Sequence, residues 1–323
     1  MRSHRKTTTL LLAAGTLLVG ALGATPAGAA EDTTATRNTS TPGHTKGFWT
    51  ADRMRAARPL DLNRAPTAVK PRPAAGRTTT IPPTRATDGA PASAPTAFPQ
   101  SGGAWTGGGA VVKTSGRVFF TMGDRTASCS GDSITSQNGS TVITAGHCVK
   151  YQGAWHTNWV FVPAYHDGSA PYGQWTATKT SATDQWAASE DMNHDVGFAV
   201  VAPQNGRTLT EAVGAQGIQF NGGYNKRMYS FGFPAATPYD GSKLIYCSGN
   251  SSRDFLFTRD HSLGCNMTGG SSGGPWFTNF DEATGLGLQV SVNSFGYVFL
   301  PNRMFGPYFG NEAKAAYDKA QLG

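Results

Sequence analysis

A run rich in glycine and serine at residues 264–276 contains side chains that could act in catalysis. Four glycines flank Ser271 and Ser272, a cysteine precedes them, and Pro-Trp-Phe follows at 275–277. Glycine tolerates positive φ and lets another backbone approach closely, so the run predicts a tight loop that points backbone N–H groups and one hydroxyl at a ligand. The competing interpretation is a glycine–serine linker. Linkers do not usually run from a cysteine straight into Pro-Trp-Phe.

A serine hydroxyl becomes a nucleophile when a histidine can accept its proton and a third group orients that histidine. The chain supplies both groups, because His147 ends the apolar segment 142–145 and Asp195 opens the apolar segment 196–201. In this arrangement His147 is the general base and then the general acid, and Asp195 holds the imidazole in the required tautomer. The order along the chain is His, Asp, Ser.

The roles assigned to His147 and Asp195 each have an alternative interpretation. His147 could be a structural histidine after a strand. Asp184 and Asp191 compete with Asp195, but both lie in polar turn sequence. Asp195 is preferred because the apolar run after it would bury its carboxylate, and a buried carboxylate hydrogen-bonded to imidazole orients it firmly. His194, beside Asp195, is expected at the surface.

Three motifs together resemble the chymotrypsin-like (trypsin-fold) serine peptidases, in particular the secreted bacterial trypsin-like and V8-like branches. They are Thr-Ala-Gly-His-Cys at 144–148, Asp-Val-Gly-Phe at 195–198 and Ser-Ser-Gly-Gly-Pro at 271–275. The resemblance covers about residues 107–320. It implies that Ser272, which precedes Gly-Gly-Pro, is the nucleophile rather than Ser271. It also implies an oxyanion hole made by the backbone N–H groups of Gly270 and Ser272, and no cofactor or metal.

Two departures from the trypsin pattern limit what the resemblance implies. Ser271 stands where trypsin-like zymogens have an aspartate that pairs with the new N-terminus, so activation by that salt bridge is not expected. Asn266 stands where trypsin has the aspartate of its specificity pocket, which removes the usual cause of an Arg/Lys preference. We expect Asn266, Met267, Ser291 and Asn293 to line the pocket, and the sequence leaves the specificity open.

Short β-rich segments between Gly, Asn and Asp turns begin near residue 107 and predict an all-β protein. Strands recurring every 10–20 residues fit two antiparallel barrels, which the family resemblance makes six-stranded, with the site in the cleft between them. A helix is predicted at 311–321, where Ala313, Ala316, Tyr317 and Ala320 recur at helical spacing. The predicted strands are residues 117–121, 140–144, 159–162, 197–201, 228–233 and 288–292.

Four cysteines in an exported chain predict two disulfides, with three possible connectivities. The local pairings are Cys129–Cys148 and Cys247–Cys265, and the first resembles the disulfide that anchors the catalytic histidine in the family. A zinc site is the alternative, but the chain has no C-x-x-C or H-x-x-x-H pairing.

The N-terminal third differs from the rest in composition. Basic residues, an apolar run and small residues predict a signal peptide at 1–30, with an uncleaved anchor as the alternative. Residues 31–105, rich in Thr, Pro, Ala and Arg, are expected to be a largely disordered propeptide and linker. The protease domain is then 106–323, with its barrels at about 106–205 and 206–323.

One island at residues 47–60 interrupts the polar propeptide sequence. Phe48, Trp49, Met54 and Leu60 could dock on a folded partner, and residues 51–57 could form a short helix. The functional interpretation is a propeptide that assists folding or masks the active site. The alternative is a flexible leader removed without consequence.

The formal net charge of +7 lies entirely in the N-terminal part. Residues 1–100 hold 13 Lys and Arg against 5 Asp and Glu, whereas residues 101–323 hold 14 against 15. A basic face on the folded domain is therefore not indicated, and neither nucleic acid nor a membrane is an expected partner. We expect a monomer that acts on protein or peptide substrates.

The sequence thus predicts a secreted, extracellular serine endopeptidase that hydrolyses peptide bonds through an acyl-enzyme. The alternative is a protease-fold protein that has lost catalysis and works as an extracellular binding module, although such proteins usually lack one triad member. A glycan-binding or glycoside-cleaving β-protein is a third interpretation. A glycosidase needs two facing carboxylates, and no such pair stands out.

Overall fold

The computed structural model of the protein describes residues 1, 34–37, 40–64, 76–86 and 96–322. The signal peptide predicted for residues 1–30 therefore lies outside the described residues apart from Met1. No helix among the described residues is both long and apolar enough to cross a membrane.

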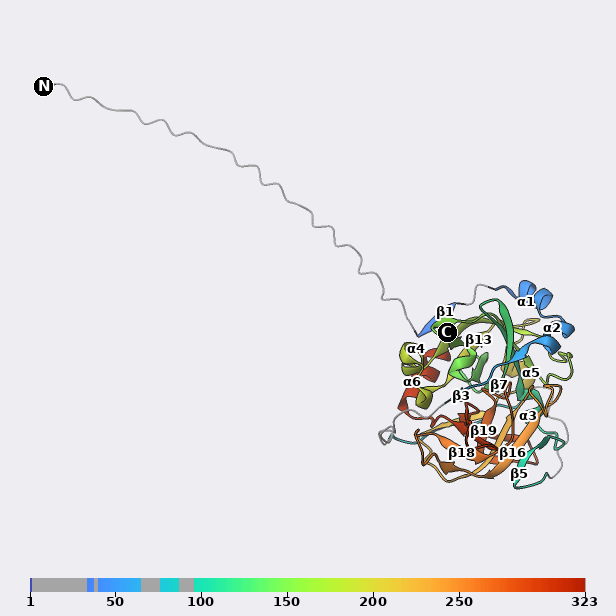
Figure 1. Cartoon of the computed structure of the whole chain (residues 1–323). Coiled ribbons are helices and arrows are strands. Elements are labelled where there is room, and N and C mark those ends of the chain that lie inside the picture. Colours follow the sequence, from blue (N-terminus) through green and yellow to red (C-terminus); the bar gives the residue numbers. More distant parts are fainter. Residues whose placement is uncertain (2–33, 38–39, 65–75, 87–95, 323) are drawn as a thin grey trace. The chain divides into compact units, whose positions relative to one another are not determined.

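The first half of the domain is a closed barrel of six strands (Figure 1). Each strand pairs antiparallel with the next, and the last pairs with the first. The prediction of an all-β fold with a six-stranded antiparallel barrel is confirmed here. In order around the barrel, the strands are β6 (Ser115–Met122), β7 (Arg125–Ile134), β8 (Thr141–Thr144), β13 (Gly197–Val201), β12 (Trp175–Ala182) and β11 (Thr157–Pro163).

The second half contains a seven-stranded and a three-stranded sheet. One pair, β14 with β20, is parallel, whereas the sequence predicts only antiparallel strand pairs. The strand β14 enters from the first barrel and forms no hairpin with β20, so no turn sets its direction. The seven strands, in sheet order, are β4 (Thr79–Ile81), β14 (Gly217–Phe220), β20 (Leu286–Val292), β19 (Pro275–Asp281), β15 (Arg227–Gly232), β16 (Ile245–Asn250) and β5 (Gln100–Ala104); the other sheet contains β17 (Ser252–Arg253), β18 (His261–Gly264) and β22 (Arg303–Gly306).

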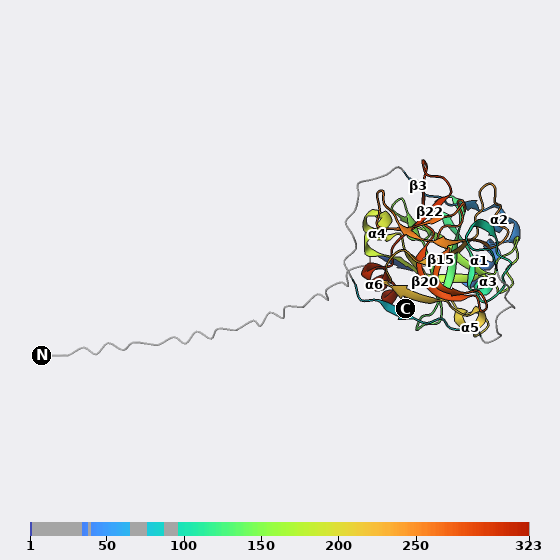
Figure 2. The ribbon, with the colours of Figure 1, turned by 90° about the horizontal axis from the view of Figure 1, so that it is seen from below.

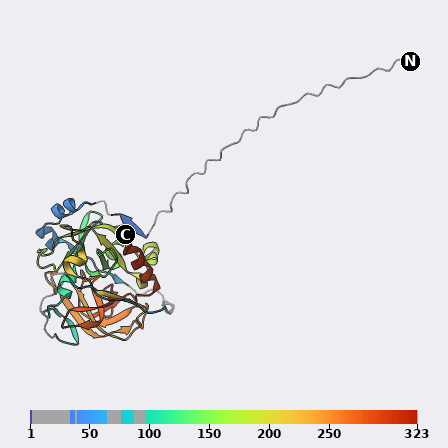
Figure 3. The same ribbon diagram turned by 180° about the vertical axis from the view of Figure 1, so that it is seen from behind.

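The C-terminal helix α6 (Asn311–Ala320) confirms the predicted helix. Its four predicted core residues, Ala313, Ala316, Tyr317 and Ala320, are all buried. Tyr317 packs against Phe198 of β13 and Phe220 of β14, and its hydroxyl donates to the Thr135 carbonyl at 2.7 Å. The helix therefore ties the end of the chain back onto both halves (Figure 3).

Two strands of the first barrel, β7 and β12, carry many serines and threonines and were not among the predicted strands. In β7, Ser130 donates to the Gly270 carbonyl at 2.9 Å and Ser133 donates to the Gly214 carbonyl at 2.8 Å. These hydroxyls are buried between the halves of the domain, where hydrogen bonds satisfy them. A prediction based on hydrophobic periodicity therefore does not find such strands.

The N-terminal segment is ordered over much of the region expected to be largely disordered. The predicted helix at 51–57 is present, and Trp49, Met54 and Leu62 are each at most 2% exposed. In Figures 1 and 2 its two helices lie on the side of the domain opposite α6. The segment is built from β1 (Ala35–Arg37), α1 (Pro42–Phe48), α2 (Ala51–Ala56), β2 (Arg58–Pro59) and β3 (Asn63–Arg64).

The predicted domain boundary at residue 106 falls just after β5, which pairs with β16. Residues 100–104 therefore complete the second sheet rather than serving as a linker, and β4 likewise pairs with β14. The remaining short elements are α3 (Val111–Thr114), α4 (Asp184–Ser189), α5 (Leu209–Val213), the 3-10 turns Gly146–Cys148 and Met192–His194, and the strands β9 (Lys150–Tyr151), β10 (Ala154–Trp155) and β21 (Gly296–Tyr297).

Candidate active site

Strand pairing brings His147 and Asp195 together. His147 lies in the turn after β8, Asp195 lies two residues before β13, and these strands pair with Thr144 opposite Gly197. The imidazole Nδ1 lies 2.8 Å from Asp195 Oδ2, and the backbone N–H of His147 donates to Oδ1 at 2.8 Å. Both side chains are fully buried. The carboxylate can therefore accept from Nδ1–H and leave Nε2 free to accept a proton.

A third donor to this carboxylate was not predicted from the sequence. Ser294 Oγ donates to Asp195 Oδ2 at 2.5 Å from the loop after β20. A buried carboxylate needs such donors because an unpaired charge in the interior is costly. The residue before Ser294 is one of those expected to line the pocket, but no local pattern links Ser294 to Asp195, 99 residues away.

Ser272 is held against the first barrel by its own backbone. Its carbonyl accepts from the N–H of Ser130 at 2.7 Å. The next residue, Gly273, has φ +81°, and a Cβ there would lie 2.1 Å from Thr144 Oγ1 and 2.4 Å from the Ser130 carbonyl. Only glycine permits so close an approach. Ser271 differs, since its hydroxyl donates back into the loop, to the Thr268 carbonyl at 2.8 Å.

A peptide carbonyl lies beside Ser272. The Gly270 N–H donates to the carbonyl oxygen of Leu60 at 3.0 Å, and Ser272 Oγ lies 3.5 Å from the same oxygen. Among the described residues, none forms a hydrogen bond with His147 Nε2. A backbone N–H aimed at a carbonyl oxygen next to a hydroxyl can stabilise negative charge on that oxygen.

Solved structures of known proteins match this chain over the whole of their own length. Protease Anisep from Arthrobacter nicotinovorans is 44% identical, with a TM-score of 0.64, and the match covers 69% of this chain and 100% of that one. A thermostable serine protease, AL20 from an extremophilic microorganism, is 40% identical, with a TM-score of 0.62, 66% of this chain covered and 99% of the other. The chain belongs to the chymotrypsin-like serine peptidases.

Two weaker similarities accompany these. A Glu endopeptidase solved in complex with MPD is 16% identical, with a TM-score of 0.55 and 70% of the peptidase and 99% of that chain covered, and it shows the shared fold alone. An extracellular metalloprotease of Bacillus subtilis (strain 168) is 26% identical over 182 residues, or 54% of the peptidase. The peptidase spans 54% of that relative's length. No family model matches the chain.

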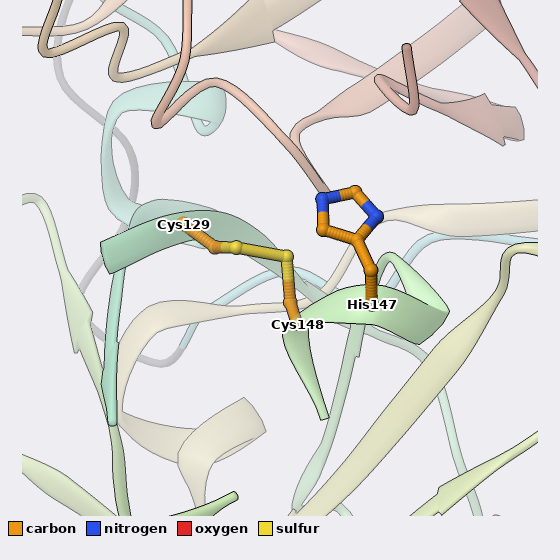
Figure 4. Close-up of side chains that lie close together, drawn as sticks. All are labelled: Cys129, His147 and Cys148. Atoms are coloured by element: carbon orange, nitrogen blue, oxygen red, sulfur yellow. A yellow bond between two sulfur atoms is a disulfide. The ribbon is translucent and has the colours of Figure 1, made fainter. Parts of the chain in front are cut away.

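Both predicted disulfides of the peptidase are formed (Cys129–Cys148 and Cys247–Cys265). The first ties β7 to the residue after His147 (Figure 4). A metal site would need the thiolates of Cys129 and Cys148, which lie within 4.8 Å of His147. Both sulfurs are bonded to each other, so neither is available as a thiolate ligand.

A cavity of about 370 Å³ opens beside Ser272 of the peptidase. Asn266 and Met267 line it, as expected, together with Ser294, Gly296 and Met304. Ser291 and Asn293 do not, which corrects the sequence-based expectation.

The two misplaced residues are fully buried among other groups. Asn293 Oδ1 accepts from Ser230 Oγ and Trp276 Nε1, whereas Ser291 Oγ donates to the Pro307 carbonyl at 2.9 Å. Ser291 in β20 and Asn293 just after it both direct their side chains into the core, and in this stretch the residues that line the cavity begin at Ser294. The sequence-based pocket was therefore placed too early along this stretch.

The other acidic candidates lie away from the imidazole. Asp184 is largely exposed and pairs with Lys319 at 3.2 Å. Asp191 caps the short turn before Asp195, accepting from the N–H of Asn193 at 3.1 Å. His194, expected at the surface, is instead buried against Arg259. The short turn Met192–His194 buries both Asn193 and His194.

A neutral histidine supports the backbone of His147. His156 Nε2 lies 2.9 Å from the His147 carbonyl, and the ring stacks on Phe120. Burial lowers the pKa of His156 to about 4, so the ring is neutral at physiological pH and Nε2 carries the proton that it donates. A neutral neighbour adds no positive charge that would oppose protonation of His147.

Proposed function

We propose that the peptidase is a secreted serine endopeptidase whose catalytic residues are His147, Asp195 and Ser272. Ser272 Oγ attacks the scissile carbonyl while His147 Nε2 takes its proton. The resulting oxyanion is held by the N–H groups of Gly270 and Ser272. His147 then gives the proton to the leaving amine, which departs and leaves an acyl-enzyme, and water hydrolyses the ester by the same steps.

One observation carries this proposal. The Leu60 carbonyl oxygen lies 3.0 Å from the Gly270 nitrogen and 3.5 Å from Ser272 Oγ. An amide carbonyl between a hydroxyl and an N–H donor occupies the position that a scissile carbonyl needs. The bonds from His147 to Asp195 give the neighbouring imidazole the orientation that a general base requires.

The segment before the domain is proposed as its propeptide. The sequence-based boundary puts the propeptide at 31–105 and the mature protease at 106–323. Because β5 pairs with β16, we place the start of the mature chain before residue 100 instead. The two disulfides favour an oxidising, extracellular location. The signal peptide at 1–30, the monomeric state, and the lack of nucleic-acid or membrane partners remain predictions. The substrates are proteins or peptides.

The proposal is tested with a fluorophosphonate probe on mature wild-type protein and on the Ser272→Ala variant, followed by peptide mapping. We expect the probe to label Ser272 and no other residue, and the variant to lose both labelling and peptide hydrolysis. Ser271→Ala is the matched control and should keep both. Correctly folded mature protein that neither reacts nor hydrolyses peptides would contradict the proposal and favour the inactive binding module.

A further inference from the structure

The segment 58–64 crosses the active site as an extended chain. Its first part, β2, pairs with Ala127 and Ser128 of β7, and the N–H of Leu60 donates to the Ser128 carbonyl at 3.0 Å. The Leu60 carbonyl then lies at Gly270 and Ser272. Its last part, β3, pairs with β21. The chain therefore runs from the β7 side of the site to the β21 side.

The chemistry fixes the direction in which a substrate must cross the same site. His147 must reach the leaving nitrogen to protonate it, so the chain after the scissile bond lies on the His147 side. The disulfide from Cys148 places β7 on that side. The substrate residue whose carbonyl is attacked needs a cavity for its side chain beside Ser272. Gly296 of β21 lines such a cavity. A substrate therefore runs from β21 to β7.

We propose that residues 58–64 occupy the active site in the direction opposite to a substrate and so inhibit the peptidase without being cut at the Leu60–Asp61 bond. This inference rests on the proposed function. Both flanking pairings are parallel, β2 with β7 and β3 with β21. A chain in the opposite direction would be antiparallel to both strands.

The position of Asp61 independently supports the reversal. In a substrate, the residue that donates the carbonyl places its own side chain in the cavity. Here the cavity is lined by Asp61, the residue after that carbonyl. The nitrogen of Asp61 therefore leaves toward the cavity rather than toward His147. Attack by Ser272 would give a tetrahedral intermediate whose leaving nitrogen His147 cannot protonate, so the C–N bond stays and the intermediate returns to the intact peptide.

Buried anchors upstream hold the segment in place. Trp49 is fully buried, its indole Nε1 donates to the Asn158 carbonyl at 2.7 Å, and its own carbonyl accepts from Gln174 Nε2 at 2.7 Å. On the other side of Leu60, Leu62 is 2% exposed within the core cluster. Anchoring on both sides of the site fixes the direction of the chain between them.

The experiment compares the rate of fluorophosphonate labelling at Ser272 in the full-length precursor and in the mature protein. We expect the precursor to react at least tenfold more slowly. Trp49→Ala should speed labelling of the precursor at least tenfold, toward the rate of the mature protein, since truncating a buried tryptophan removes most of its docking energy. The exposed Lys46→Ala, from the same segment, is the control and should leave the rate unchanged. Leu62→Ala tests the same point if Trp49→Ala fails to fold.

Mass spectrometry of the incubated precursor tests the direction itself. We expect the Leu60–Asp61 bond to stay intact in the wild-type precursor, as it does in Ser272→Ala. A new N-terminus at Asp61 that forms in wild type and not in Ser272→Ala would overturn the reversed direction. Equal labelling of precursor and mature protein would overturn the inhibition alone, whereas labelling of neither would contradict the proposed function itself.

Discussion

At the scale of single residues, the carboxylate of Asp195 accepts from three donors, and one of them could not be predicted. Two donors belong to His147 and the third is the hydroxyl of Ser294. All three residues are buried. In the proposed mechanism, a carboxylate fixed in this way would keep the imidazole in one orientation during the reaction.

We predict that Ser294→Ala lowers kcat about tenfold with little change in KM, because a hydrogen bond to a charged group stabilises by about 1.5–3 kcal/mol. Steady-state kinetics on a peptide amide measure both constants. Ser291→Ala, which removes an equally buried hydroxyl bonded to Pro307, is the control and should keep kcat. Equal losses in both variants would show that the effect comes from packing.

A second residue-scale prediction concerns Asp132 of β7. Burial raises its pKa from 3.8 to about 8, although Ser115 donates to it at 3.0 Å. Between these pH values the folded chain holds a proton that the unfolded chain has lost, so the free energy of unfolding falls as pH rises, by up to about 1.4 kcal/mol per pH unit. Above the folded pKa the loss is complete.

Asp132→Asn removes the titrating carboxyl group, and with it this group's contribution to the pH dependence of stability. Urea unfolding at several pH values from 4 to 8 should therefore show the variant gaining stability relative to wild type as the pH rises. Parallel stability curves for the two proteins would contradict the raised pKa.

At the scale of elements, the loop at 268–274 forms only because glycines occupy its strained or crowded positions. Gly270 has φ +93°, and a Cβ there would lie 3.0 Å from the Phe233 carbonyl. The N–H that bonds Leu60 belongs to this residue. Its direction therefore depends on a backbone conformation that side chains with a Cβ rarely adopt.

We predict that Gly270→Val lowers kcat about 100-fold or more, the typical cost of losing one oxyanion donor, while both disulfides still form. Kinetics and disulfide mapping measure the two effects. Gly264→Val is the control, because a Cβ at that position meets nothing within 4 Å. An unchanged kcat in Gly270→Val would remove this N–H from the mechanism.

At the scale of the whole molecule, the two halves of the domain meet through a buried glutamine between them. Gln216 Nε2 donates to Thr114 Oγ1 at 3.0 Å and to the Gly285 carbonyl at 2.9 Å, and its Oε1 accepts from Gly287. Its backbone N–H donates to the Ser133 carbonyl of β7. Through its side chain and its backbone, Gln216 thus bonds groups from three separate parts of the chain.

We predict that Gln216→Ala lowers the free energy of unfolding by about 2–4 kcal/mol, because it leaves several buried polar groups without partners. Equilibrium urea unfolding measures the change. Gln219→Ala, three residues along in β14 and bonded to Thr80 at the surface, should lower the free energy of unfolding by less than about 1 kcal/mol. Similar losses for both variants would contradict the role assigned to Gln216.

Local sequence determined much of this protein. Alternating and apolar runs located β6, β8, β11, β13, β15, β20 and α6, because their burial follows from periodicity. Both disulfide pairings followed from local spacing and family resemblance. Each residue proposed for catalysis lies in a short motif that can be recognised from a few consecutive residues.

The tertiary structure decided what depends on contacts between distant parts of the chain. Ser294 reaches Asp195 across 99 positions, and the carbonyl of Leu60 meets Ser272 across 212. The cavity wall begins at Ser294 rather than at Asn293, since the direction of a side chain depends on how its strand packs. The composition of residues 31–105 predicted a largely disordered segment, yet Trp49 is fully buried against the domain. A segment that lacks a core of its own can be ordered by a surface that no local pattern encodes.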